Sequence, residues 1–124
     1  MGKIDFNPST LLNPVPVVMI SSENAEKNNI FTAAWVGTVC SEPPMVSVSI
    51  RKERLSYSMI KETGEFVINL VTKELAKACD YCGVKSGRDV DKFKELKLTP
   101  LESQNISAPG IEESPVRLEC RVEK

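Results

Sequence analysis

The 124-residue sequence contains no histidine. This absence excludes a Ser-His or Cys-His catalytic pair and a zinc site of mixed histidine and cysteine ligands. Any proton transfer has to use another ionisable side chain or a cofactor. The net charge is −1, so the chain also lacks the strong basic excess that nonspecific binding of nucleic acids or anionic membranes requires. We therefore expect neither a nucleic acid nor a membrane as a partner.

Two kinds of hydrophobic segment are missing as well. No apolar run approaches the roughly 20 residues of a membrane-spanning helix. The first residues, Met1-Gly-Lys-Ile-Asp-Phe, lack the apolar core of a secretory signal. These absences predict a cytoplasmic location. In a reducing cytosol the four cysteines, at positions 40, 79, 82 and 120, are expected to be free thiols.

What is present is typical of one soluble domain, which we assign to residues 1–124. Hydrophobic residues make up 41% and charged residues 27%, and the length suffices for one modest core. Strands come first, helices are inserted and a late strand follows, an order that favours a small antiparallel barrel over a doubly wound sheet. No Gly-x-Gly-x-x-Gly follows any strand, which excludes a Rossmann fold. We expect strands at 15–21, 31–40, 45–51, 66–71 and 116–123, helices at 55–61, 73–82 and 89–96, and a loop at 99–115.

Local signals predict how these elements begin and end. Ser56 is a candidate N-cap for the first helix and Gly64 its stop. Thr72 is expected to cap the second helix, and Gly83 to end it. The strand at 116–123 alternates apolar and charged residues, so one face is apolar and Cys120 is expected to be buried. An earlier strand, another subunit or a missing part of the chain has to cover such an edge strand.

The strand at 31–40 has an unusual composition. It combines the small residues Ala33, Ala34 and Gly37 with the only tryptophan, Trp35. A core strand normally carries bulky branched side chains because they fill space. Small residues beside one large aromatic therefore suggest that a ligand fills the space, although Trp35 alone is more often a core residue. Cys40, at the end of this strand, either touches such a ligand or fills core.

A second cluster suits a phosphate group. Ser49 and Arg51 share one face of their strand, and a helix begins near Ser56. A helix start offers free backbone N–H groups, and an arginine adds a bidentate fork. The competing interpretation is a solvated surface with a simple serine cap.

Two further motifs are weaker. Residues 85–93 carry Lys85, Arg88 and Lys92 around a flexible Ser-Gly, which suits a loop closing over an anion but equally a charged surface helix. Cys79 and Cys82 form a single C-x-x-C at the end of a helix, which is a poor match to a redox dithiol or a zinc site. No metal is expected.

Together these segments resemble the flavin reductase-like, FMN-binding split-barrel family, and within it the flavoredoxins. The resemblance runs from about Leu12 to the end of the chain and rests on the order and spacing of five pieces. These are residues 13–19, 29–44 (Asn-Ile-Phe-Thr-Ala-Ala-Trp-Val-Gly-Thr-Val-Cys-Ser-Glu-Pro-Pro), 49–57 (Ser-Ile-Arg-Lys-Glu-Arg-Leu-Ser-Tyr), 64–70 and 80–93, with 113–120 similar to the family's next strand.

The resemblance implies a mainly β fold with flanking helices, an FMN-binding split β-barrel of Greek-key type. It also implies that family members continue beyond Lys124, so we expect this chain to lack the usual C-terminal strands and helix. FMN is the implied cofactor and a homodimer the implied assembly. The implied flavin contacts are Asn29, Thr32 and Trp35 beside the ring; Thr38, Val39, Cys40 and Ser41 near its polar edge; Ser49, Arg51, Ser56 and Tyr57 at the ribityl phosphate; and Lys85, Ser86, Arg88 and Lys92 from the closing loop.

With FMN bound, the redox chemistry takes place at flavin N5 and the protein needs no catalytic acid or base, which suits the absence of histidine. Three functions remain open at this stage. The chain is an NAD(P)H:flavin oxidoreductase, a flavoprotein that exchanges electrons with a redox protein, or a truncated barrel without flavin that serves as a dimeric structural module. No sequence motif distinguishes NADH from NADPH.

Overall fold

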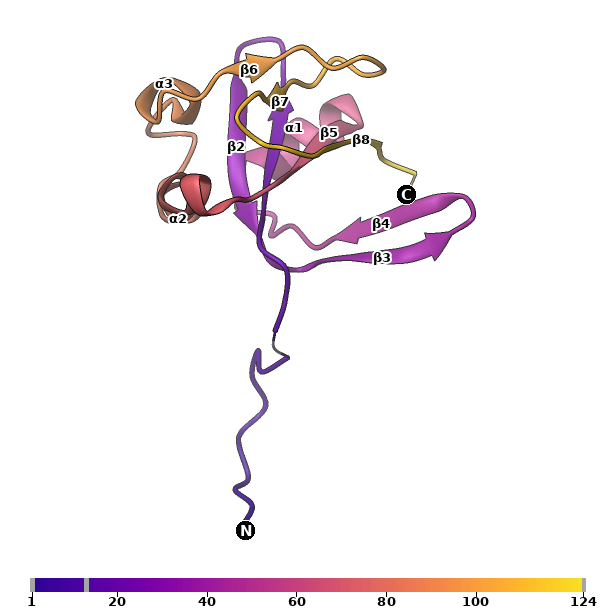
Figure 1. Cartoon of the computed structure of the whole chain (residues 1–124), viewed down its shortest axis with the longest axis vertical. Helices are drawn as coiled ribbons and strands as arrows, with labels where there is room; N and C mark the ends of the chain where they lie inside the picture. Colours follow the sequence, from indigo (N-terminus) through magenta and orange to yellow (C-terminus); the bar gives the residue numbers. More distant parts are fainter. Residues whose placement is uncertain (1, 13, 124) are drawn as a thin grey trace.

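A four-stranded antiparallel sheet with the order β2-β1-β5-β8 forms the centre of the computed structural model (Figure 1). The structure describes residues 2–12 and 14–123. Asn13, which opens the first family-like segment, and both ends of the expected domain, Met1 and Lys124, lie outside the described residues. The strands of the sheet are β1 (Val18–Glu23), β2 (Asn28–Ala33), β5 (Glu65–Leu70) and β8 (Arg117–Arg121).

Each face of this sheet contributes to a different hydrophobic core, because successive side chains of a strand point to opposite faces. Val18 and Ile20 of β1 belong to the first core, whereas Met19 between them belongs to the second. The first core adds Phe31, Ala33, Ile60, Phe66 and Ile68; the second adds Ile30, Leu75, Cys79, Cys82, Phe93 and Ile111.

The helices divide between the two faces. Helix α1 (Leu55–Thr63) contributes Ile60 to the first core. A 3-10 turn, η1 (Lys73–Leu75), leads into α2 (Ala76–Val84), which covers the second face together with the short α3 (Lys92–Glu95). In Figure 1, α2 and α3 lie on the side of β2, away from β8.

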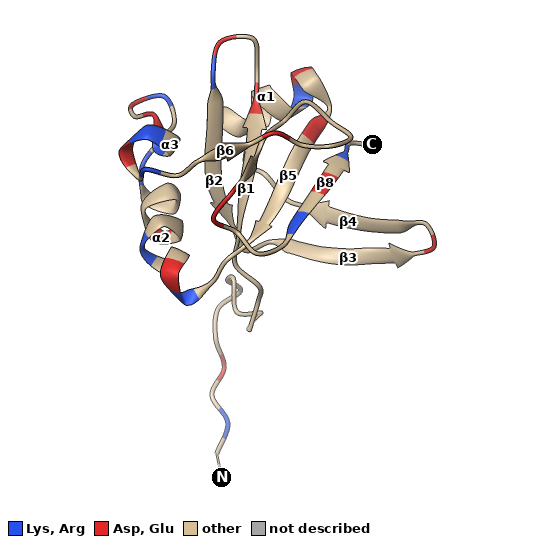
Figure 2. Cartoon of the chain, turned by 45° about the horizontal axis from the view of Figure 1, so that its top comes forward, with Lys and Arg blue, Asp and Glu red and all other residues tan. Residues whose placement is uncertain are grey.

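A separate hairpin projects from this body. Its strands are β3 (Val36–Ser41) and β4 (Pro44–Val48), and among the described residues they pair only with each other. Figure 2 shows that the hairpin is charged only at its tip, where Glu42 lies. Partly buried residues of its base, Val36, Val46 and Val48, pack against the first core.

The single strand expected at 31–40 is therefore wrong. The chain bends at Ala34 and Trp35, so β2 stays in the main sheet and β3 enters the hairpin. The backbone N–H of Ser49 donates to the Trp35 carbonyl at 2.9 Å and closes the base of the hairpin at this bend. Small side chains at 33 and 34 thus mark a corner between two sheets.

The signals at helix ends had mixed outcomes. Gly64 ends α1 as predicted, with φ of 73° and its N–H donating to Ile60 O at 2.7 Å. The N-cap of α1 is Arg54, whereas Ser56 lies buried in the first turn. Thr72 precedes η1 but its side chain makes no capping bond, and α2 runs through Gly83 to Val84. The third helix begins three residues later than expected, because Asp91 caps it by accepting from the Lys94 N–H at 3.2 Å.

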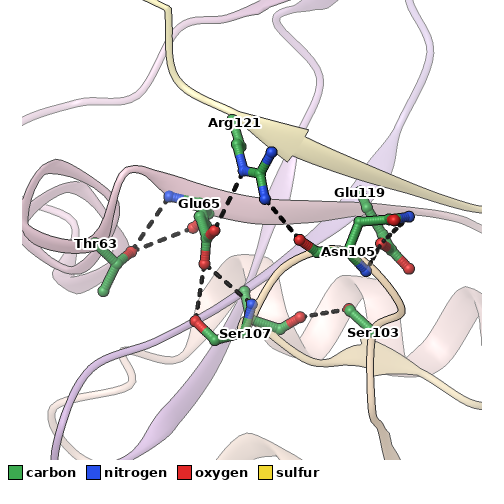
Figure 3. A network of polar contacts seen from close by, with 8 residues as sticks. Thr63, Glu65, Ser103, Asn105, Ser107, Glu119 and Arg121 are labelled. Atoms are coloured by element: carbon green, nitrogen blue, oxygen red, sulfur yellow. Dashed lines mark hydrogen bonds and ion pairs between the residues drawn. The ribbon is translucent and has the colours of Figure 1, made fainter.

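The expected loop at 99–115 contains the two-residue strands β6 (Pro100–Leu101) and β7 (Gly110–Ile111). Carboxylates fix the connection between them (Figure 3). Glu119 accepts from the backbone N–H groups of Gln104 and Asn105 at 3.0 and 2.8 Å. Glu65 accepts from the Ser107 N–H at 3.0 Å and lies 3.5 Å from Arg121 Nε. These hydrogen bonds hold the pKa values of both carboxyl groups below their usual range.

The last strand pairs with β5 and forms the edge of the sheet. No described strand pairs with its outer edge, and its apolar face is more exposed than predicted. Cys120 is only partly buried, although the burial suffices to raise the pKa of its thiol. Val116, Leu118 and Val122 are between 43 and 45% exposed.

Candidate functional site

A cavity of about 250 Å³ lies where the turn before α1, strand β2 and the loop after α2 meet. Six of the residues expected from the sequence to bind a ligand line it. They are Asn29, Arg51, Ser56, Lys85, Ser86 and Lys92, and the other lining residues are Phe31, Glu53, Arg54, Leu55 and Gly87.

The cavity wall is strongly basic. Four cationic side chains, Arg51, Arg54, Lys85 and Lys92, face one carboxylate, Glu53. The Glu53 carboxylate lies 3.7 Å from Arg51 Nε, and both side chains are largely exposed. Within residues 2–12 and 14–123 the only other ion pair joins Arg121 to Glu65, so no carboxylate neutralises Arg54 or Lys85. An anionic ligand therefore suits this wall.

Helix α1 adds to the positive potential. Its N-terminal residues Leu55 and Ser56 line the cavity, and no side chain caps this end of the helix. The first backbone N–H groups of a helix carry partial positive charge and bind anions. In this helix the nine residues from Leu55 to Thr63 align their dipoles toward the cavity.

A buried hydrogen-bond cluster joins two walls of the cavity. The amide of Asn29 donates to Ser56 Oγ at 2.8 Å, and Ser22 Oγ lies 3.5 Å from the same hydroxyl. Asn29 also supports the opposite loop, because a Cβ placed on Gly87 would lie 2.1 Å from its Oδ1. Any other residue at position 87 would therefore force the buried Asn29 side chain to shift.

Lys92 is buried to 2% exposure and bonds to the backbone. Its Nζ donates to Ile30 O at 2.7 Å and to Cys82 O at 2.8 Å. The first acceptor lies on the edge strand β2, and the second belongs to the last turn of α2, where carbonyls lack a helical partner. Burial lowers the pKa of Lys92, and the neighbouring Arg54 lowers it further. One of the three ammonium protons remains for the cavity.

Arg88 supports the cavity from outside. Its Nη1 donates to Glu53 O at 2.6 Å, which ties the loop after α2 to the turn before α1. The backbone N–H of Arg88 donates to Ser86 Oγ at 3.1 Å. In Figure 2 the ribbon at α3 is partly blue, which marks Lys and Arg positions.

The remaining expected residues lie elsewhere. Thr32 points to the opposite face of β2 from Asn29, where its hydroxyl donates to the Cys79 carbonyl and it lines a second, more apolar groove. Ser49 is exposed, and Tyr57 is half-buried with Lys61 Nζ 6.0 Å from its ring centroid. Trp35, Thr38, Val39, Cys40 and Ser41 lie on the bend and the projecting hairpin, where Trp35 is 52% and Val39 61% exposed.

Comparison with protein-family models identifies the family to which this chain belongs. The model of the flavin reductase like domain matches residues 11–124. The chain belongs to the flavin reductase-like family. An uncharacterized protein of Archaeoglobus fulgidus is 40% identical to it over 113 residues, covering 91% of this chain and 63% of that protein.

Solved structures of the flavin reductase-like family share the fold. Flavoredoxin of Desulfovibrio vulgaris (Miyazaki F) superposes with a TM-score of 0.92 at 35% identity, over 97% of this chain and 66% of that chain. The FMN-binding domain of a flavin reductase-like enzyme from Shewanella baltica gives 0.81 at 25% identity, over 90% and 59%. The sheet and the hairpin thus form the open, split barrel that the resemblance implied. The chain spans 61 to 64% of the length of the first curated relatives.

In this flavin reductase-like chain the C-x-x-C motif belongs to the core. Cys79 and Cys82 are both buried and unbridged. Burial raises the pKa of the Cys82 thiol to about 11 and also raises that of Cys79, so both stay protonated at neutral pH. No cluster of three or more metal-ligating side chains occurs among the described residues, and no helix within them is long and apolar enough to cross a membrane.

Five residues that line the cavity were not among the predicted contacts: Phe31, Glu53, Arg54, Leu55 and Gly87. Arg54 precedes the predicted cap Ser56 by two positions, and its role as N-cap residue depends on where α1 begins. Gly87 lies between two predicted contacts, Ser86 and Arg88. Only the approach of Asn29, 58 positions earlier in the chain, shows why a glycine is needed there.

Proposed function

We propose that this chain is the FMN-binding part of a flavoprotein that transfers electrons between flavin and either NAD(P)H or a redox protein. The observation that carries the proposal is the basic cavity at the uncapped start of α1, in a chain whose family and fold are those of flavin reductases. Two arginines, a free lysine and helix N–H groups suit a phosphate monoester. When bound, FMN supplies the hydride or electron transfer itself.

The cavity residues then have separate tasks. Arg51 and Arg54 bind the phosphate, and Lys85 and Ser86 approach it from the opposite loop. Asn29 and Lys92 position these two walls through their buried bonds. Phe31, which lines the cavity, and the exposed Trp35 at the base of the hairpin are the aromatic side chains that would hold the ring.

The phosphate assignment is tested by comparing FMN with riboflavin. Arg54→Ala and Arg51→Ala should each weaken FMN by about 1.5–3 kcal/mol, roughly 10- to 150-fold in Kd, since each removes a charged hydrogen bond. Riboflavin binding should stay nearly unchanged. Lys52→Ala is the matched control, because Lys52 lies in the same turn but does not line the cavity. Equal losses for both ligands would contradict the phosphate site.

A spectrum and a kinetic experiment separate the three functions left open by the sequence. Flavin absorbance that co-purifies with the protein rules out a purely structural module. Rapid bleaching on stopped-flow mixing with NADH or NADPH identifies an NAD(P)H:flavin oxidoreductase. A flavoprotein that bleaches only when a reduced protein partner is added is an electron carrier. As part of this proposal the protein acts in the cytoplasm as a homodimer.

A further inference from the structure

Acceptor groups on the walls of the basic cavity are already in use. Arg88 Nη1 donates to Glu53 O at 2.6 Å, and Lys27 Nζ donates to Gly87 O at 2.8 Å. Glu53 and Gly87 both line the cavity. The Glu53 carboxylate is the one carboxylate in the described lining, and it lies 3.7 Å from Arg51 Nε. Protein cations therefore occupy two carbonyls and this carboxylate before a ligand arrives.

The two serine hydroxyls in the lining are arranged in the same sense. Ser56 Oγ accepts from the Asn29 amide at 2.8 Å, and Ser86 Oγ accepts from the backbone N–H of Arg88 at 3.1 Å. A hydroxyl that accepts a hydrogen bond becomes a better donor of its single proton. The other neighbour of Ser56 Oγ is Ser22 Oγ at 3.5 Å, which is too long for a strong bond. Both serines in the lining can therefore donate to a ligand.

Other donors of the lining also remain for a ligand. Among the described residues, neither Arg54 nor Lys85 forms an ion pair. The backbone N–H groups of Leu55 and Ser56 open helix α1, and no side chain caps this end. Lys92 uses two of its three protons on backbone carbonyls. The cavity thus offers donors from α1, α3 and the loop after α2, and it suits a ligand whose oxygens all accept.

A phosphate monoester meets this demand in only one of its protonation states. Above its second pKa of about 6 it is a dianion with three acceptor oxygens. Below that pKa it is a monoanion that keeps a P–O–H group, and this proton needs an acceptor. In the cavity the proton would face N–H and O–H groups, so the monoanion loses a hydrogen bond as well as half of its charge.

We propose that the basic cavity is a donor-only site, which selects oxyanions without a proton and binds the phosphate of FMN as the dianion. This inference rests on the proposed function and adds a regulation of its site, because FMN binding then weakens as the phosphate takes up a proton below about pH 6.

The charged groups of the protein do not produce the same pH dependence. Those that face the phosphate are Arg51, Glu53 and Arg54 from the turn before α1, Lys85 from the loop and Lys92 from α3. The arginines keep their charge throughout. Proton uptake by Glu53 or Lys92 makes the cavity more positive, which strengthens anion binding and acts in the opposite direction.

Sulfate and hydrogenphosphate test the donor-only arrangement directly. At about pH 8.5 both are dianions of nearly the same shape, and only hydrogenphosphate carries a proton. Each anion competes with FMN at constant ionic strength, and flavin fluorescence reports the displacement. We expect sulfate to bind at least about 10-fold more tightly, because the P–O–H group of hydrogenphosphate finds no acceptor. Equal displacement by the two anions would overturn the donor-only site. FMN that binds no better than riboflavin would instead overturn the phosphate site of the proposed function.

Asn29→Asp tests the hydrogen bond that orients Ser56. The carboxylate is nearly isosteric with the amide but only accepts, so the Ser56 proton turns to it and Ser56 Oγ faces the cavity as an acceptor. The preference for sulfate should then fall below about 3-fold. Asn28→Asp is the matched control, because it adds the same charge on β2 outside the cavity lining, and it should keep the full preference. If Asn29→Asp folds by circular dichroism and also keeps the full preference, Ser56 is not oriented as a donor and the inference is wrong.

A pH series extends the test to FMN and needs no variant. Between about pH 7 and pH 5 the dianion fraction of the phosphate falls from roughly nine-tenths to one-tenth, so the dissociation constant of FMN should rise about 10-fold. Riboflavin has no phosphate and should bind equally at both pH values, which controls for changes in the fold. An FMN dissociation constant that stays constant over this range would show that the monoanion binds as well as the dianion, and it would refute the selection.

Discussion

Replacing Lys92 by methionine removes the donor that joins α2, α3 and β2. Two carbonyls, Ile30 O and Cys82 O, lose their partner, and both residues are fully buried. An unsatisfied buried acceptor costs about 1–3 kcal/mol, so the two together cost about 2–6 kcal/mol. Methionine returns part of this, because an ammonium group no longer has to be buried. We expect a net loss of about 2–4 kcal/mol.

Urea unfolding followed by circular dichroism measures this loss. For 124 residues the entropy of unfolding makes 1 kcal/mol equivalent to about 4 °C, so the midpoint of thermal unfolding should fall by roughly 8–15 °C. Lys94→Met is the matched control, since Lys94 lies on the same helix but is exposed, and it should change stability by less than about 0.5 kcal/mol. If Lys92→Met unfolds as the control does, the two bonds do not stabilise the fold.

Three further predictions concern backbone fit and acid. Gly87→Ala places a Cβ 2.1 Å from Asn29 Oδ1, so we expect a loss of about 1–3 kcal/mol in stability and weaker FMN binding by titration. Gly64→Ala meets no neighbour but strains φ of 73°, and thermal unfolding should show a loss of about 1 kcal/mol and unchanged FMN binding. Because the pKa values of Glu65 and Glu119 are lowered in the folded state, their stabilisation is full above about pH 4.3 and is lost as pH falls through the folded values. Hydrogen exchange of the β6–β7 loop should therefore accelerate below about pH 4 before the central sheet exchanges, and simultaneous exchange would contradict the clamp.

The elements that could be predicted are those whose signal is local. Strand β5 and helix α1 begin within a residue of expectation, because a run of apolar residues and a left-handed glycine act through their own neighbours. The charged turn before α1 likewise combined phosphate-binding residue types within a few positions. The part of the basic cavity around Arg51 and Ser56 was therefore predicted, because these residues lie close together along the chain.

For other residues the surroundings could not be predicted, because they depend on the sheet or the strand face to which each residue belongs. Thr32 and Asn29 are three positions apart on β2 and therefore lie on opposite faces once the strand is straight. In an unbroken strand to Cys40, Trp35 would share a face with Asn29. The bend after Ala33 instead moves Trp35 to the base of the hairpin. Lys92 was predicted as a ligand contact from its charge, and only the structure shows that it is buried and bonds two backbone carbonyls.

The sequence by itself determined the family, the composition of each strand face and the absence of histidine-based chemistry. These depend on residue identity and on periods of two or 3.6 residues. Only the tertiary structure decided that β3 leaves the main sheet, that Asn29 lies against Gly87, and that Lys92 joins Ile30 to Cys82. Those contacts join residues 10 to 62 positions apart, and their energy depends on distances and burial that arise only when the chain has packed.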